Sequence, residues 1–384
     1  TYYNIIILPY GKSSMVVPNV VMDGGWQQVT SFEREEIDGI SASVSVPTIK
    51  LDDKAPALTV MSPLRSSSSF GSFFNSLRSI SPMSSTRSLN CMDSLHDEDV
   101  ELSSARISEF SVIGKKRKDE DRTHVGLYNL NQAPTKGSAK EGRESLCLVA
   151  VIDGHGGPGC SNYIKNNLNR IMQEVQSSHT GITDVKLRLS CMASKVLERL
   201  EVEFIKFAQD NSDPSGACIV LSLSTERYTC IANLGDCLGV FYTPHGGIQL
   251  PSQVHRGVSP AEARRVEKAG GFIDESGRVQ GILYPSRCIG DLDVKLAYPG
   301  IISVEPTVTL IEVPSPVGPK RPFLLLATDG VWDAFSTKKA AKLVKETLKK
   351  HDWDIGSANP AKILVEKSVK LGSNDDSSAA IILF

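Results

Sequence analysis

The sequence predicts an α+β fold in which packed antiparallel β-sheets are flanked by helices. From about residue 106 onward, short runs of β-branched and apolar residues follow one another with only a turn between them, as in antiparallel sheets. Long segments with helical periodicity stand between groups of these runs, which favours α+β over an alternating parallel fold. With 384 residues and 40% apolar composition, the chain can bury a large core.

The expected elements follow from the period of the apolar residues. Continuous or alternating apolar runs predict strands at 107–113, 146–152, 218–224, 228–234, 239–242, 301–310, 323–327 and 379–384. Apolar residues spaced by three and four predict helices at 159–176, 184–208, 260–269, 338–350 and 360–371. Residues 106–384 are therefore expected to form one folded domain.

Residues 1–105 differ in composition, and we expect a largely disordered N-terminal extension. Residues 5–8 and 15–22 could form short strands, but serine dominates between Ser62 and Ser88, where acidic residues are absent. Such a linker has too little apolar surface to offset the entropy of ordering. The acidic run at 93–101 is either a solvated segment ahead of a domain boundary or a docking or autoinhibitory element.

Composition excludes several classes of partner. A net charge of -2 and a pI near 6.4 predict no strongly basic surface, so we expect no nucleic-acid partner. No apolar stretch approaches the roughly 20 residues that span a bilayer, so we expect no membrane span. The eight cysteines are scattered without a CxxC pair, which is typical of a reducing compartment. We expect a monomer in the cytoplasm, with the nucleus as an alternative.

Acidic residues recur at the ends of the apolar runs, often beside glycine. Asp153 ends the run at 146–152 and is followed by Gly154, His155 and two more glycines, which allow close approach of a ligand. Similar positions are held by Glu120, Asp121, Asp236, Asp329, Asp333 and Asp375. An isolated Asp-Gly pair is most often a turn, but clustered carboxylates repel one another unless a cation compensates them. Oxygen ligands favour Mg²⁺ or Mn²⁺, and two such ions about 3.5–4 Å apart suit phosphoryl transfer to water.

In order and spacing, these residues resemble the type 2C family of metal-dependent protein serine/threonine phosphatases. The resemblance rests on the series KxxxED, DGHGG, GD, SRxxGD, TDGxWD and a late Asp, and it covers essentially all of residues 106–384. It implies two antiparallel sheets packed face to face between helices, an α-β-β-α sandwich with the metals at one end. It also implies that metal-bound hydroxide hydrolyses phosphoserine or phosphothreonine in a phosphoprotein substrate.

The residues that match the family's metal ligands are carboxylates and one backbone carbonyl. The resemblance implies that Asp153 bridges two Mg²⁺ or Mn²⁺ ions, with the Gly154 carbonyl, Asp329 and Asp375 as further ligands. Glu120 and Asp121 match residues that contact metal directly or through water. Asp236 and Asp333 match residues that can hold a third, weaker ion.

Two further residues carry expected roles in catalysis. His155 matches the residue proposed to protonate the leaving oxygen, which its ordinary pKa of about 6.5 permits; the alternative is that it only orders the glycine loop. Lys116 stands where the family has an arginine that grips the substrate phosphate, and it keeps the charge but loses the two-pronged contact. The alternative gives that role to Arg117. Arg287 is expected to form a buried salt bridge that supports the site.

Two other function classes compete with the enzyme. A catalytically weak or inactive member of the same fold would act as a regulatory binding module, and departures at 237–238, 254 and 284–285 are compatible with reduced activity. However, every matched carboxylate is present. A calcium-binding structural protein is a third possibility, but the chain lacks a twelve-residue loop with ligands at alternating positions.

Overall fold

The computed structural model describes residues 3–10, 13–20, 106–116, 118–130, 144–249 and 252–384. These residues belong to two units, divided between Ser88 and Leu89, and each unit is described by itself. In the first, β1 (Tyr3–Tyr10) and β2 (Ser13–Val20) pair antiparallel, in agreement with the strands expected at 5–8 and 15–22. The serine-rich linker and the acidic run at 93–101 lie outside the described residues.

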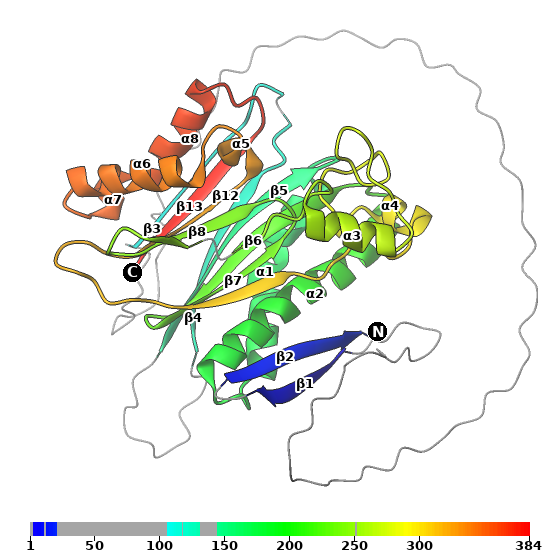
Figure 1. The fold of residues 1–384 in the computed structure, drawn as a ribbon, viewed down its shortest axis with the longest axis horizontal. Helices are drawn as coiled ribbons and strands as arrows, with labels where there is room; N and C mark the ends of the chain where they lie inside the picture. The colour runs from blue at the N-terminus through cyan, green and yellow to red at the C-terminus, as the bar shows by residue number, and fades with distance from the viewer. Residues whose placement is uncertain (1–2, 11–12, 21–105, 117, 131–143, 250–251) are drawn as a thin grey trace, which may run out of the picture. The chain divides into compact units, whose positions relative to one another are not determined.

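Two antiparallel sheets form the centre of the second unit (Figure 1). The first sheet has the strand order β11-β7-β6-β5-β4, with β10 paired to β6, and the second has the order β3-β13-β12-β8-β9. The first comprises β4 Arg122–Asn129, β5 Ser145–His155, β6 Gly216–Ser224, β7 Tyr228–Leu234, β10 Ile289–Gly290 and β11 Thr307–Glu312. The second comprises β3 Ile107–Val112, β8 Leu238–Tyr242, β9 Ile248–Gln249, β12 Phe323–Ala327 and β13 Ser377–Leu383.

Helices cover the outer face of each sheet. In Figure 1, α1 and α2, drawn in green, lie on the first sheet, and the orange and red helices α5 to α8 lie on the second. The helices are α1 Gly159–Ser178, α2 Val185–Asn211, α3 Pro260–Lys268, α4 Leu292–Ala297, α5 Asp329–Trp332, α6 Thr337–Lys350, α7 Ile355–Ala358 and α8 Pro360–Lys370. The expected α-β-β-α sandwich is therefore confirmed.

The central strands are buried on both faces, which explains their continuous apolar sequences. Alternate side chains of a strand point to opposite faces of its sheet. In β5, Leu148 and Ile152 pack with the core beneath α1 and α2, whereas Val149 and Val151 pack between the two sheets against residues such as Leu324 of β12. Each such strand thus joins the outer core to the core between the sheets.

Several expected boundaries were wrong for identifiable reasons. The strand expected at 301–310 begins only at Thr307, because Pro306 has no N–H to donate to a ladder. Strand β4 was missed because it is a partly buried edge strand with polar residues and Gly126. The short helices α4, α5 and α7 lack the length that makes helical periodicity visible.

The antiparallel pairing brings the acidic strand ends together at one end of the sandwich. The start of β4 lies beside the end of β5, since Arg122 pairs with Ile152, and the start of β13 lies beside the end of β12, since Ala327 pairs with Ala379. Asp153 therefore comes from the first sheet, Asp329 and Asp375 adjoin strands of the second, and Asp236 lies in the connection from β7 of the first sheet to β8 of the second. Among the described residues, no helix combines the length and apolar character needed to cross a membrane.

Candidate active site

Three carboxylates that the sequence singled out converge at this end of the sandwich. One oxygen from each of Asp153, Asp236 and Asp329 lies within 4.8 Å of the others. Asp153 lies near the end of β5, Asp236 follows β7, and Asp329 is the first residue of α5. We call these three residues and the neighbouring Asp121 the acidic centre. Asp333 lies one helical turn after Asp329 and its side chain is 67% exposed, so it forms the rim.

The acidic centre is electrostatically unfavourable without a cation. Burial, together with the charges of Asp376 and Asp329, raises the pKa of Asp121 to about 8, although a hydrogen bond from Thr328 opposes the shift. Burial and the charge of Asp236 raise the pKa of Asp329 to about 7. Burial and the surrounding carboxylates also raise the pKa of Asp153 well above 3.8. A set of oxygen ligands that repel one another in this way fits a hard divalent cation such as Mg²⁺ or Mn²⁺.

Glu120 orders the glycine loop. Its Oε1 accepts a hydrogen bond of 2.7 Å from the Gly157 backbone N–H, and Gly157 has a φ of +125° that favours glycine. The backbone also approaches closely at Gly154, where a Cβ would lie 2.6 Å from the Glu120 carbonyl oxygen. Asp376 fixes this arrangement, because its carboxylate accepts from the backbone N–H groups of Gly114 at 2.7 Å and Glu120 at 2.8 Å.

His155 is held by a buried carboxylate at the edge of the acidic centre. Its Nε2 lies 2.7 Å from Oδ2 of Asp291, a residue with a left-handed backbone at the start of α4. Burial alone would lower the pKa of His155, but the hydrogen bond and the charge of Asp291 raise it overall. Asp291 also accepts from the Cys288 thiol at 2.8 Å. The imidazole is thus fixed in orientation and biased toward its protonated form.

Lys116 and Arg287 both form ion pairs. Lys116 Nζ donates to Asp375 Oδ2 at 2.8 Å, with side chains 52% and 42% exposed, and this hydrogen bond raises the pKa of Lys116. Lys116 therefore lies at the rim, bonded to an expected metal ligand. Arg117, the alternative to Lys116, lies outside the described residues. Arg287 forms the expected buried salt bridge, with its Nε 3.0 Å from Glu262 Oε2.

Arg256 is a site residue that the sequence did not reveal. Its guanidinium enters the acidic centre, with Nε 2.9 Å from Asp236 Oδ2 and Nη2 2.8 Å from Asp329 Oδ2. Its Nη1 lies 3.8 Å from Asp333 Oδ1. Asp236 and Asp329 lie 20 and 73 residues from Arg256 in the sequence, so no local motif connects them to it. The only available signal was a basic residue beside His255, in a segment already noted for its departures.

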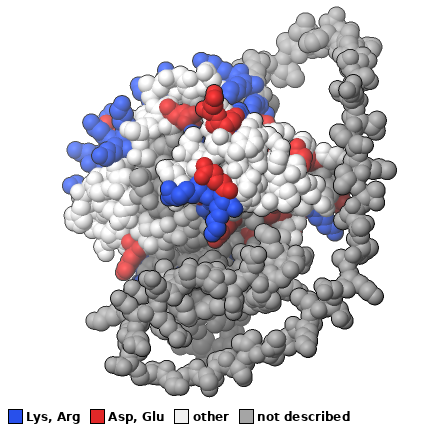
Figure 2. Space-filling model, turned by 45° about the vertical axis from the view of Figure 1, so that its right-hand side comes forward, with Lys and Arg blue, Asp and Glu red and all other residues white. Residues whose placement is uncertain are grey.

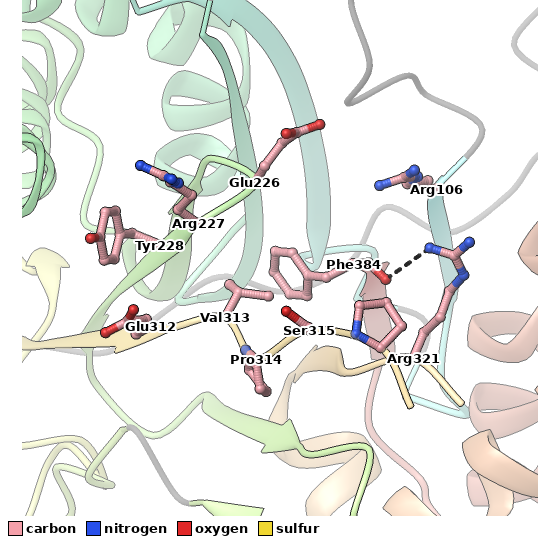
Figure 3. Close-up of a pocket in the computed structure, with 11 residues that line it drawn as sticks. Arg106, Glu226, Arg227, Tyr228, Glu312, Val313, Pro314, Ser315, Arg321 and Phe384 are labelled. Atoms are coloured by element: carbon pink, nitrogen blue, oxygen red, sulfur yellow. Dashed lines mark hydrogen bonds between the residues drawn. The ribbon is translucent and has the colours of Figure 1, made fainter. Parts of the chain in front are cut away.

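A separate pocket of about 560 Å³ lies at the opposite end of the strands (Figure 3). It is lined by residues at the start of β7 and just beyond the ends of β11 and β13, including Tyr228, Val313 and Phe384. Arg321 donates to the Phe384 backbone oxygen at 3.4 Å at its edge. None of the acidic-centre residues lines this pocket, so the candidate chemistry belongs to the acidic centre.

Comparisons with known proteins agree with this geometry. The family model described as Protein phosphatase 2C matches residues 109–377, more than half of the chain. The chain is 29% identical to "Probable protein phosphatase 2C 54" of Oryza sativa subsp. japonica, covering 73% of this chain and 72% of that protein. It is 26% identical to "Protein phosphatase 1L" of Bos taurus, covering 74% of each.

Solved structures share the fold. A structure described as a C. elegans sex determining protein superposes with a TM-score of 0.60 and 27% identity, covering 73% of this chain and 65% of that chain. The region that the family model matches, 109–377, contains the whole first sheet, the covering helices and every residue of the acidic centre, and it ends at the first residue of β13. Sequence, fold and the convergence of carboxylates lead to one conclusion: the chain belongs to the protein phosphatase 2C family.

Proposed function

We propose that this chain hydrolyses phosphoserine and phosphothreonine in phosphoprotein substrates, with Mg²⁺ or Mn²⁺ ions bound at the acidic centre. The observation that carries the proposal is the convergence of Asp153, Asp236 and Asp329 within 4.8 Å at the end of the sandwich. Membership of a protein phosphatase family supports the reaction class. On the face drawn in Figure 2, acidic and basic side chains lie in small groups of both signs, which suits a protein substrate better than a polyanion.

The chain offers ligands for two ions and for a third. Asp153, the Gly154 carbonyl, Asp329 and Asp375 would hold the two ions, with Glu120 and Asp121 in contact directly or through water. The pair Asp236 and Asp333 would hold a third, weaker ion. When bound, the ions activate water for attack on phosphorus and neutralise the charge of the phosphate.

His155 would protonate the leaving serine or threonine oxygen. Asp291 holds the ring through Nε2, which leaves Nδ1 as the nitrogen that can carry a proton to the substrate. The hydrogen bond and the charge of Asp291 raise the pKa of His155, which favours the protonated ring that a general acid needs. Lys116, at the rim, would contact the substrate phosphate after releasing Asp375.

The direct test is hydrolysis of a phosphothreonine peptide by the full chain, with Mn²⁺ and after complete chelation. We expect turnover only with metal, and loss of turnover in Asp153→Asn and Asp329→Asn, which remove ligand charge but almost no volume. Asp210→Asn, at an exposed position in α2, is the matched control and should retain the wild-type rate. Turnover that persists without metal would contradict the mechanism. A folded wild type without turnover in Mn²⁺ would favour the regulatory binding module.

We also propose that the protein is a monomer in a reducing compartment, the cytoplasm or the nucleus. The seven cysteines among the described residues are all free, and six of them are buried, as expected for cysteines that serve as small apolar side chains. Light scattering of the purified chain tests the monomer, and a stable dimer at micromolar concentration would contradict it. Imaging of a tagged protein tests the compartment.

A further inference from the structure

The guanidinium of Arg256 contacts two carboxylates of the acidic centre. It donates from Nε to Asp236 at 2.9 Å and from Nη2 to Asp329 at 2.8 Å. The Arg256 side chain is 30% exposed, while Asp236 is 7% and Asp329 is 26% exposed. These hydrogen bonds are therefore shielded from water in large part and are stronger than those of a surface ion pair.

The backbone on either side of Arg256 is anchored to the sandwich. The backbone N–H of His255 donates to the Gly235 carbonyl at 2.9 Å, and the Gly235 N–H donates back to His255 Nδ1 at 3.1 Å. His255 Nε2 also lies 2.8 Å from the Thr307 hydroxyl. On the other side, the Gly257 N–H donates to the Tyr284 carbonyl at 3.3 Å. Because both neighbours are fixed, Arg256 is directed into the acidic centre by its backbone.

We propose that Arg256 is an internal counter-cation that competes with metal ions for Asp236 and Asp329, and so lowers the metal affinity of this site. The proposal rests on the proposed function, in which these same carboxylates hold metal. A guanidinium and a divalent ion repel each other and cannot both use the same carboxylate oxygens at hydrogen-bonding and ligand distance. Metal binding through Oδ2 of Asp236 and Oδ2 of Asp329 therefore requires that Arg256 give up its contacts, and binding through their other oxygens brings the ion close to the guanidinium charge.

Because residue 256 is an arginine, this competition does not depend on pH. Burial opposes the charged form, but the charges of Asp236 and Asp329 hold the pKa of Arg256 above its ordinary value. The side chain consequently stays positive wherever the protein is folded, and pH does not relieve the competition. The Lys116–Asp375 pair differs, since both of its side chains are about half exposed and water weakens their attraction.

The first measurement is Mn²⁺ binding to the full chain by titration calorimetry. Arg256→Met removes the charge and keeps an unbranched side chain. We expect it to lower the dissociation constant for Mn²⁺ by about 10-fold, the scale of one charge-assisted hydrogen bond. Arg256→Lys keeps the charge with a single donor group and should fall between Arg256→Met and the wild type. Arg170→Met is the matched control, because it also deletes one positive charge from an ion pair, with Glu174 on α1. Its affinity should equal that of the wild type.

The second measurement is the thermal unfolding temperature, which depends on the contacts of Arg256 with Asp236 and Asp329 and needs no activity assay. In chelator, Arg256→Met should unfold at a lower temperature than the wild type, because Asp236 and Asp329 lose their counter-cation. In saturating Mn²⁺ this difference should shrink or reverse. A merely structural arginine would stabilise the protein equally under both conditions.

The possible outcomes separate this inference from the proposed function. Wild type that binds Mn²⁺ with the same affinity as Arg256→Met, or more tightly, overturns the competition and leaves the proposed function intact. If neither the wild type nor Arg256→Met binds Mn²⁺, both the inference and the proposed function are overturned. If Arg256→Met does not fold, Arg256→Lys decides alone, and an affinity equal to that of the wild type overturns the inference.

Discussion

Replacing Asp121 with asparagine removes one titrating carboxyl from the acidic centre while keeping its shape. Asp121 is 6% exposed, and burial with the charges of Asp376 and Asp329 raises its pKa from 3.8 to about 8. An amide oxygen can still accept the hydrogen bond from the Thr328 hydroxyl, which measures 3.0 Å in the wild type. We therefore expect Asp121→Asn to be more stable than the wild type when both proteins are free of metal.

The sign and size of this effect follow from proton linkage. From about pH 4 to about pH 8 the unfolded chain has lost the Asp121 proton and the folded chain retains it, so the contribution of Asp121 to stability falls as pH rises. The full pKa difference corresponds to about 5 kcal/mol near pH 7.5. Relaxation of the protein and water penetration reduce the cost of the buried charge, so we expect the variant to gain about 1–3 kcal/mol in the free energy of unfolding.

Urea denaturation in chelator, followed near pH 5 and near pH 7.5, measures this gain. Asp121→Asn should gain more at the higher pH, while the exposed control Asp210→Asn should track the wild type at both. In saturating Mn²⁺ the wild type should become the more stable protein, because the ion favours the charged carboxylate. A variant that is less stable than the wild type in chelator near pH 7.5, or a gain that does not depend on pH, would refute the reasoning.

Three further outcomes are expected. Lys116→Arg should raise kcat/KM on a phosphothreonine peptide by roughly 3- to 30-fold, because arginine can make two hydrogen bonds to phosphate, and Lys116→Ala should lower it. If kcat/KM is unchanged in the Lys116 variants and falls strongly in Arg117→Ala, the phosphate-binding role belongs to Arg117. Arg287→Met should lower the free energy of unfolding by about 1–3 kcal/mol in urea denaturation, since Glu262 loses one charged partner; an unchanged value would make the salt bridge energetically neutral. A chain lacking residues 1–105 should remain folded by circular dichroism and active on the peptide, and aggregation would place the domain boundary earlier.

The accuracy of the sequence-based fold depended on burial. Strands β5, β6, β7 and β12 are buried on both faces and therefore appear as continuous apolar runs with clear limits. Among the strands that the structure describes, β4 pairs only with β5, and its mixed composition has no such signature. Its position is fixed by the ladder with β5, a tertiary interaction that local propensity does not contain.

The carboxylates of the site were predictable because each is attached to a strand end. Once Asp153 and Asp329 are placed at the ends of buried strands, antiparallel pairing brings them to the same side of the molecule. The cations could not be predicted in this way. Arg256 and Lys116 meet their partners through long side chains across 73 and 259 residues of sequence, and no periodicity encodes such contacts.

The attachment of the candidate metal ligands to both sheets has a mechanical consequence. Asp153 is attached to one layer of the sandwich and Asp329 to the other, while Asp236 lies in the connection between them, so the spacing of their oxygens depends on how far apart the layers stand. That distance is set by side chains such as Val149 and Leu324, which lie between the sheets. An ion bound by residues of both layers would link the two sheets. Smaller or larger side chains between the sheets would then change the metal affinity without altering any residue that binds the ion.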